Sequence, residues 1–165
     1  MHSGQGILGT DAAKQAKQRS GTMSGIIVVG VDASGTARKA AETARDLAVA
    51  LGATLHVVSA FETDRTEVYG SGSDKWIVSD AGEAEKVARD IAGSLAVAGL
   101  AVTYSSARGK PADALLREAE RLEARMIVVG NRRMHGLGRV LGSIANSVAH
   151  NASCDVYIAN TYGAD

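Results

Sequence analysis

The chain has 165 residues, of which 45% are hydrophobic and 22% charged, a composition that predicts one globular domain with an ordinary core. Its 18 lysines and arginines balance its 18 aspartates and glutamates, so no net charge attracts nucleic acid or a membrane surface. The single cysteine, Cys154, rules out an internal disulfide, and no apolar run approaches the ~18–20 residues of a membrane span. Without a secretory signal pattern either, we expect a cytoplasmic protein that binds neither nucleic acid nor membrane.

Residues 1–23 are small and polar, and we interpret them as a flexible extension or a vector-derived remnant. The folded domain is predicted at residues 24–165. The extension contains Gly4-Gln-Gly6-Ile-Leu-Gly9, which matches the glycine pattern of dinucleotide-binding proteins. Because no strand precedes these glycines, the pattern lacks the context that gives it meaning, and we assign it no function.

From Ser24 onward the chain alternates between strand and helix patterns. Short apolar runs predict strands at residues 26–31, 54–60, 100–106, 126–129 and 156–159. Apolar residues at helical spacing predict helices at residues 37–51, 76–98, 111–122 and 143–151, with Trp76 anchoring the second. Residues 61–75 are polar and glycine-containing, which predicts a loop.

Strands separated by helices favour a doubly wound parallel sheet with helices on both faces. Ligands of such sheets bind beyond the carboxyl ends of the strands, at the point where the strand order reverses. Asp32 follows the first predicted strand and Gly130 ends the fourth, so both lie at that edge. If these two strands are neighbours, the two segments line one crevice.

The segment that begins at Gly130 has the features of an anion site. A buried strand ends there, a basic loop with Arg132, Arg133 and His135 follows, and Gly142-Ser143 opens a helix. Backbone N–H groups and the helix dipole converge on such a helix start, which makes it a phosphate cradle. The same residues also suit ordinary turn and cap chemistry around a solvated loop, so both interpretations stand at this point.

These segments resemble the universal stress protein family in chain order, from about Ser24 to Tyr162. The residues that carry the resemblance are Val28-Val-Gly30-Val-Asp32-Ala-Ser34-Gly, Arg108-Gly109-Lys-Pro111, Ile127-Val-Val-Gly130-Asn, Leu141-Gly142-Ser143 and Asn151-Ala-Ser-Cys154-Asp-Val-Tyr-Ile158. The resemblance implies a flavodoxin-like five-stranded sheet of order 3-2-1-4-5. It also implies a homodimer, formed through the last strand. In one branch of the family it implies that ATP or another adenine nucleotide binds in the crevice, and such a nucleotide can bring a bound Mg²⁺ ion.

By this resemblance Asp32 lies near the adenosine and Ala60 near the adenine. Gly130 and Gly142 allow close approach of the backbone to phosphates, and Ser143 donates a hydrogen bond to them. The remaining residues of the implied site are Asn131, Arg132, Arg133, Gly136 and Ile144.

One residue departs from the pattern of the nucleotide-binding branch, Gly-x2-Gly-x9-Gly-Ser/Thr. Arg133 stands where the second glycine belongs, and only eight residues separate it from Gly142. A left-handed backbone at Arg133 would cost roughly 1–2 kcal/mol. Alternatively, Gly136 takes the glycine's role, and loop arginines replace the lost backbone donor with charge-assisted contacts to phosphate.

The sequence shows no catalytic motif: neither a P-loop nor a nucleophile elbow is present, and the four histidines lack the spacing of metal ligands. His56 interrupts the second strand, where we interpret it as a hydrogen-bonded or edge histidine. We therefore predict a dimeric adenine-nucleotide-binding protein that senses its ligand in stress response or signalling. A slow ATPase or phosphotransferase, and an adaptor that has lost nucleotide binding, remain alternatives.

Overall fold

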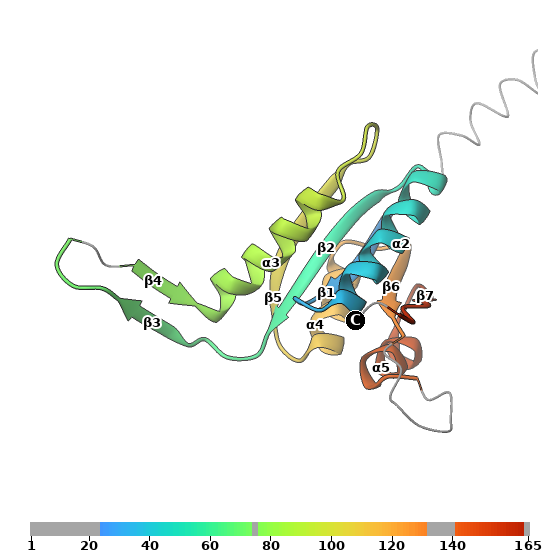
Figure 1. Cartoon of the computed structure of the whole chain (residues 1–165). Coiled ribbons are helices and arrows are strands. Elements are labelled where there is room, and N and C mark those ends of the chain that lie inside the picture. Colours follow the sequence, from blue (N-terminus) through green and yellow to red (C-terminus); the bar gives the residue numbers. More distant parts are fainter. Residues whose placement is uncertain (1–23, 74–75, 132–140, 164–165) are drawn as a thin grey trace, which may run out of the picture.

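The computed structural model describes residues 24–73, 76–131 and 141–163. A five-stranded parallel sheet forms its centre, in the order β5-β2-β1-β6-β7 (Figure 1). The strands are β1 (Ile26–Val31), β2 (Thr54–Phe61), β5 (Val102–Arg108), β6 (Met126–Gly130) and β7 (Asp155–Ala159). Counting only these strands, the order is 3-2-1-4-5, so the predicted flavodoxin-like sheet is confirmed.

Two layers of helices cover the two faces of the sheet (Figure 1). Helices α2 (Gly35–Leu51) and α3 (Asp80–Ser94) pack on one face, and α4 (Pro111–Arg121) and α5 (Ser143–Asn151) on the other. Strand β1 supplies both cores by alternation, with Ile27 and Val29 in the first and Val28 in the second. Its continuous apolar sequence is therefore explained by burial on both faces.

Helix α2 meets the sheet through small side chains. Ala40, Ala41, Ala44 and Ala48 are all fully buried along one stripe of this helix. Because alanine projects only a methyl group, the helix backbone lies close to β1 and β6. The helix ends at Gly52, whose φ of 62° is the left-handed conformation that glycine adopts without strain.

The predicted loop at 61–75 and the predicted helix from Trp76 are wrong. Instead, β3 (Thr66–Tyr69) and β4 (Trp76–Ser79) form an antiparallel hairpin, and Trp76 lies in a strand rather than a helix. The helix begins only at Asp80, because the Ser79 hydroxyl accepts the Gly82 N–H and caps it. The β-branched pair Ile77-Val78 favours a strand just before this cap.

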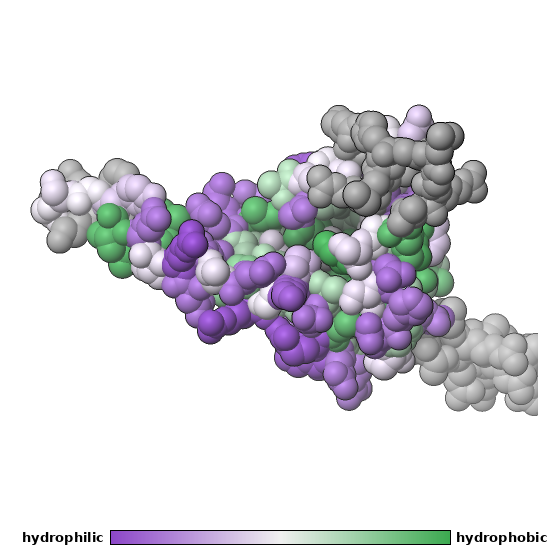
Figure 2. Space-filling view, turned by 90° about the horizontal axis from the view of Figure 1, so that it is seen from below, coloured by the Kyte–Doolittle hydropathy of each residue, from purple (hydrophilic) through white to green (hydrophobic). Residues whose placement is uncertain are grey.

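The hairpin projects from the body of the molecule beyond α3 (Figure 1). Val68 and Ile77 face each other across its two strands and are 59% and 70% exposed. Figure 2 shows hydrophobic residues, coloured green, on the projecting hairpin.

Strand β5 begins and ends two residues later than the sequence predicted. Among the described residues, no helix combines the length and hydropathy that a membrane crossing requires.

The alanine stripe of α2 yields a stability prediction. Ala44→Leu should lower the free energy of unfolding by about 1–3 kcal/mol, because the larger side chain has no space between helix and sheet. Ala50→Leu makes the same chemical change at an exposed position of the same helix and should alter stability by less than about 0.5 kcal/mol. Urea unfolding followed by circular dichroism measures both. Equal effects of the two substitutions would contradict the close packing of α2.

Candidate functional site

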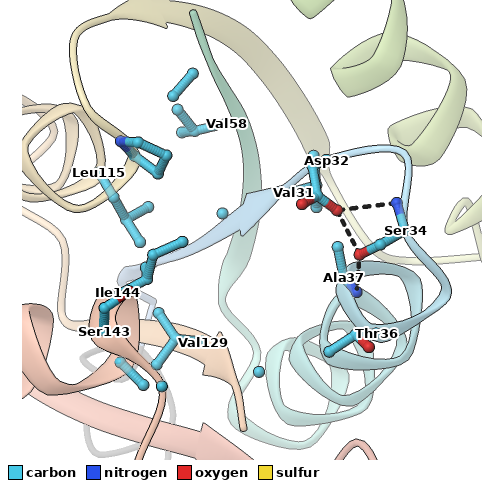
Figure 3. Close-up of a pocket in the computed structure, with 16 residues that line it drawn as sticks. Val31, Asp32, Ser34, Thr36, Ala37, Val58, Leu115, Val129, Ser143 and Ile144 are labelled. Carbon is cyan, nitrogen blue, oxygen red and sulfur yellow. Dashed lines mark hydrogen bonds between the residues drawn. The ribbon is translucent and has the colours of Figure 1, made fainter. Parts of the chain in front are cut away.

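A cavity of about 220 Å³ opens at the carboxyl edge of the sheet (Figure 3). Strands β1 and β6 pair directly, so the turn after β1 and the residues before α5 meet there, as the sequence predicted for neighbouring strands. The cavity is lined by Gly30, Val31, Asp32, Ser34, Thr36, Ala37, Val58, Ala60, Pro111, Leu115, Val129, Gly130, Gly142, Ser143, Ile144 and Ala145.

Asp32 is held at the rim of the cavity by the turn that starts α2. Its Oδ1 accepts two hydrogen bonds from Ser34, one from the backbone N–H at 2.9 Å and one from the hydroxyl (Figure 3). The Ser34 hydroxyl oxygen accepts in turn from the Ala37 N–H at 3.2 Å, which caps α2. The carboxylate is thus fixed while it stays exposed to a ligand. Among the described residues, nothing donates to its second oxygen, Oδ2.

The start of α5 offers N–H groups that no side chain among the described residues caps. Its cap is Gly142, which offers no side-chain hydrogen bond, and no acidic residue occupies the first turn. The first N–H groups of a helix have no partner within the helix, and the dipole makes this end positive. Ser143, exposed at the first position, adds a hydroxyl beside them. By contrast, Ser34 already occupies an N–H at the start of α2.

The opposite walls of the cavity are apolar. They are formed by Val58 on β2, Leu115 on α4 and Val129 on β6, together with Ala60. The first three side chains are each no more than 3% exposed. Flat aromatic ligand groups suit such walls, while the polar groups of Asp32 and α5 lie at the margin. The cavity therefore has an apolar interior and a polar rim with both an acceptor and donors.

Close packing explains why residue 130 is glycine. A Cβ atom there would lie 3.2 Å from the Thr161 methyl carbon and 3.3 Å from that of Thr36. Gly142 has a φ of −60°, which any residue adopts, so its contribution is the missing side chain rather than backbone freedom. Gly130 thus permits close packing of Thr161 and Thr36, and neither glycine has a left-handed backbone.

The structure brings together six of the residues that sequence reasoning placed in the site. Those that line the cavity are Asp32, Ala60, Gly130, Gly142, Ser143 and Ile144. Asn131 lies beside the cavity, where its N–H donates to the Ala159 carbonyl at 2.9 Å and its own carbonyl accepts from Thr161. Its side-chain Oδ1 is buried and has no hydrogen-bond partner among the described residues. Arg132, Arg133 and Gly136 lie outside the described residues.

Sequence reasoning missed the contributions of Ser34, Thr36, Pro111 and Leu115. Ser34 and Pro111 were identifiable as helix starts, and the helix starts of a parallel α/β sheet share one edge. The sequence could not show that α4 reaches across to β1, where Leu115 lies within 3.1 Å of a Cβ built on Gly30. That contact depends on how the helices pack.

Other reactive groups in the described residues lie outside this cavity. Burial raises the pKa of the Cys154 thiol, and the neighbouring Asp155 carboxylate raises it further, in agreement with a packing role. In the described ranges, no three metal-binding side chains of the histidine, cysteine or acidic type lie together. His56 is buried and hydrogen-bonded, as interpreted from the sequence.

Several known proteins resemble this chain. A Coxiella burnetii (strain RSA 493 / Nine Mile phase I) universal stress protein A homolog 1 is 53% identical over 38 residues, which span 23% of this chain and 26% of that relative. The crystal structure of a universal stress protein in complex with cAMP superimposes with a TM-score of 0.61 at 27% identity, covering 84% of this chain and 98% of the other. An Archaeoglobus fulgidus universal stress protein in complex with dAMP gives a TM-score of 0.61 at 22% identity, covering 83% and 98%.

The family model for universal stress proteins matches residues 23–160. This range includes all five strands of the parallel sheet and every described residue that lines the cavity. The chain belongs to the universal stress protein family.

Proposed function

We propose that this protein binds an adenine nucleotide in the cavity at the carboxyl edge of the sheet and senses it rather than converting it. The observation that carries the proposal is the composition of this cavity, which combines an apolar interior, a fixed carboxylate and an open helix N-terminus. The two structures described above, which contain cAMP and dAMP, support the choice of an adenine nucleotide.

Each part of a nucleotide has a matching group in the cavity. The walls formed by Val58, Leu115 and Val129 suit the flat adenine base. Asp32 accepts hydrogen bonds, as a carboxylate does from ribose hydroxyls. The N–H groups at the start of α5 and the Ser143 hydroxyl donate to phosphate oxygens. The donors and acceptors present therefore fit the ligand.

The volume of the cavity favours binding of the nucleoside portion within the described residues. At about 220 Å³ it is smaller than the roughly 300–1,000 Å³ of typical small-molecule sites. The phosphates then extend along the start of α5. For ATP, Asp32 is the carboxylate available to a Mg²⁺ ion at the rim, and Arg132 and Arg133, which follow Gly130 and Asn131 in the sequence, are the basic residues proposed for the outer phosphates.

We also propose that two copies associate through β7, the last strand of the sheet. This strand lies at the sheet edge, where no strand of the described part of the chain pairs with its outer N–H and C=O groups. Tyr157 and Ile158 in β7 are 42% and 38% exposed. Pairing with a second copy gives the outer N–H and C=O groups of β7 hydrogen-bond partners, and it covers the side chains of Tyr157 and Ile158.

Nucleotide binding is tested by titration calorimetry of the nucleotide-free protein with AMP, cAMP, and ATP with and without Mg²⁺. We expect binding at micromolar concentrations by at least one of them. Ser143→Ala should weaken it about tenfold, because a hydrogen bond to a charged phosphate is lost. Ser147→Ala, on the same helix one turn further and away from the cavity, should leave the affinity unchanged.

Absence of heat in all four titrations, together with no nucleotide in the protein as purified, would overturn the proposed function. Equal affinities of wild type, Ser143→Ala and Ser147→Ala would place the ligand elsewhere. Unfolding curves of each variant show whether the substitution acts on binding or on the fold.

A slow ATPase or phosphotransferase that uses the same cavity is the alternative, favoured by the exposed carboxylate of Asp32 at the rim. A sensor should release no phosphate beyond the uncatalysed rate in a single-turnover experiment with ATP and Mg²⁺. Phosphate release that Asp32→Ala abolishes, while ATP still binds, would establish the enzyme instead. Ser79→Ala, which removes a cap remote from the cavity, is the control for a general loss of stability.

The dimer is tested by sedimentation velocity. Wild-type protein at micromolar concentration should sediment as a dimer, and Ile158→Lys should sediment as a monomer, because a charge on the paired edge opposes association. Val68→Lys places the same charge on the projecting hairpin and should remain dimeric. A monomeric wild type would contradict association through β7.

A further inference from the structure

The chain that follows the last strand of the sheet holds the backbone beside the cavity. The β6–β7 ladder stops at the pair of Gly130 and Ala159, where the Asn131 N–H donates to the Ala159 carbonyl at 2.9 Å. Two residues further along, the Thr161 hydroxyl donates to the Asn131 carbonyl at 2.8 Å. Both polar groups of the Asn131 backbone are therefore bonded to the end of β7 and the residues after it, and a side chain supplies the second bond.

Thr161 also packs against Gly130. Its methyl carbon lies 3.2 Å from the place that a Cβ atom on Gly130 would occupy, and the methyl carbon of Thr36 lies 3.3 Å from the same place. Thr36 belongs to the first turn of α2 (Figure 3). Because Thr161 is only 5% exposed, little water reaches its hydroxyl as an alternative partner for the Asn131 carbonyl. The end of β6 is thus held by a buried hydrogen bond and by close packing.

These contacts reach the cavity through Gly130. Gly130 and Thr36 both line the cavity, whereas Thr161 does not. Thr161 therefore acts on a ligand only through the backbone that it holds. It lies one residue beyond the range 23–160 that matches the family model, so the family match assigns it no role.

Gly130 lies at the end of the cavity that faces α5. Along the sheet, the cavity extends from Ala60 at the end of β2, past the end of β1, to Gly130 at the end of β6. Helix α5 packs against β6 and β7, and its first residues line the cavity as well. A phosphate bound at the start of α5 is therefore closer to Gly130 than a base bound near Ala60 is.

We propose that Thr161 is a positioning residue for the phosphate of the nucleotide: its hydroxyl and methyl group hold the end of β6 in the conformation that the phosphate requires. The inference rests on the proposed function, which puts the phosphate at the start of α5. It adds a residue that never touches the ligand and still determines how tightly the ligand binds.

The expected effect follows from preorganisation. Without the hydroxyl, the Asn131 carbonyl loses its hydrogen bond, and the end of β6 is free to adopt conformations that do not fit the phosphate. The measured affinity falls in proportion to the fraction of molecules that keep the fitting conformation. Loss of one neutral hydrogen bond changes such a population about three- to tenfold.

The experiment compares wild type with Thr161→Val, which removes the hydroxyl and keeps a methyl group against Gly130. Calorimetry measures the affinity for whichever of AMP, cAMP and ATP wild type binds most tightly, and for adenosine, which has no phosphate. We expect the nucleotide affinity of Thr161→Val to fall about fivefold, while its adenosine affinity stays at the wild-type value. Thr161→Ser restores the donor and should recover most of the nucleotide affinity.

Thr43→Val is the matched control. Thr43 lies on α2, where its hydroxyl also donates to a backbone carbonyl, that of Lys39 at 3.1 Å, but it does not line the cavity. The same exchange of a hydroxyl for a methyl group at this position should leave both affinities at wild-type values. Urea unfolding of every variant separates a loss of stability from a loss of affinity.

A nucleotide affinity of Thr161→Val equal to that of wild type would overturn the positioning role while leaving the proposed function intact. Equal losses for nucleotide and adenosine would overturn it too, because the hydroxyl would then support the whole cavity rather than the phosphate end. Absence of nucleotide binding by wild type would overturn the proposed function and this inference together.

Hydrogen exchange of the wild-type protein provides the test if Thr161→Val does not fold. The Asn131 N–H, which is bonded to Ala159, should exchange more slowly with the nucleotide bound than with adenosine bound, because the phosphate requires the held conformation. Equal exchange rates in the two complexes would contradict the proposal.

Discussion

The parallel pairing of β1 with β6 determines where this molecule has a cavity. Strand β1 pairs with β2 on its other side, so the strand order reverses at β1. Helix α2 leaves the end of β1 towards one face of the sheet, whereas α5 follows β6 towards the other. The two helix starts diverge and leave a space between them that neither fills. Asp32 and Ser143, which are far apart in the sequence, both line that space.

Small residues make this arrangement tight. The buried alanines of α2 let its backbone approach the sheet, and at Gly130 even a methyl group would press on Thr36 and Thr161. The absence of a side chain at Gly142 leaves the start of α5 open, where a serine or aspartate would have occupied its N–H groups. The site thus depends as much on side chains that are missing as on those that are present.

The hydrogen-bonded chain of Thr103, His56, Ser105 and Glu118 shows that one wall of the cavity is not held by apolar packing alone. Leu115 supplies an apolar contact to the cavity, and one turn further along α4 Glu118 joins the buried hydrogen bonds. This helix therefore combines an apolar contact to the cavity with a hydrogen bond to the edge strand β5.

The sequence by itself determined the alternation of strands and helices and the carboxyl-edge location of the site, because apolar runs, glycines and helix starts carry local signals. The strand order and lining residues such as Ala60 and Ile144 followed from the resemblance to the universal stress protein family. The sequence did not predict the hairpin at 66–79, since the short polar strand β3 has little apolar periodicity and Trp76 to Ser79 continues into a helical pattern. Only the tertiary structure placed Leu115 against Gly30 and joined His56 to Glu118. These contacts depend on the packing of α4 across two strands, and no local pattern in the sequence specifies the distance between elements that are far apart along the chain.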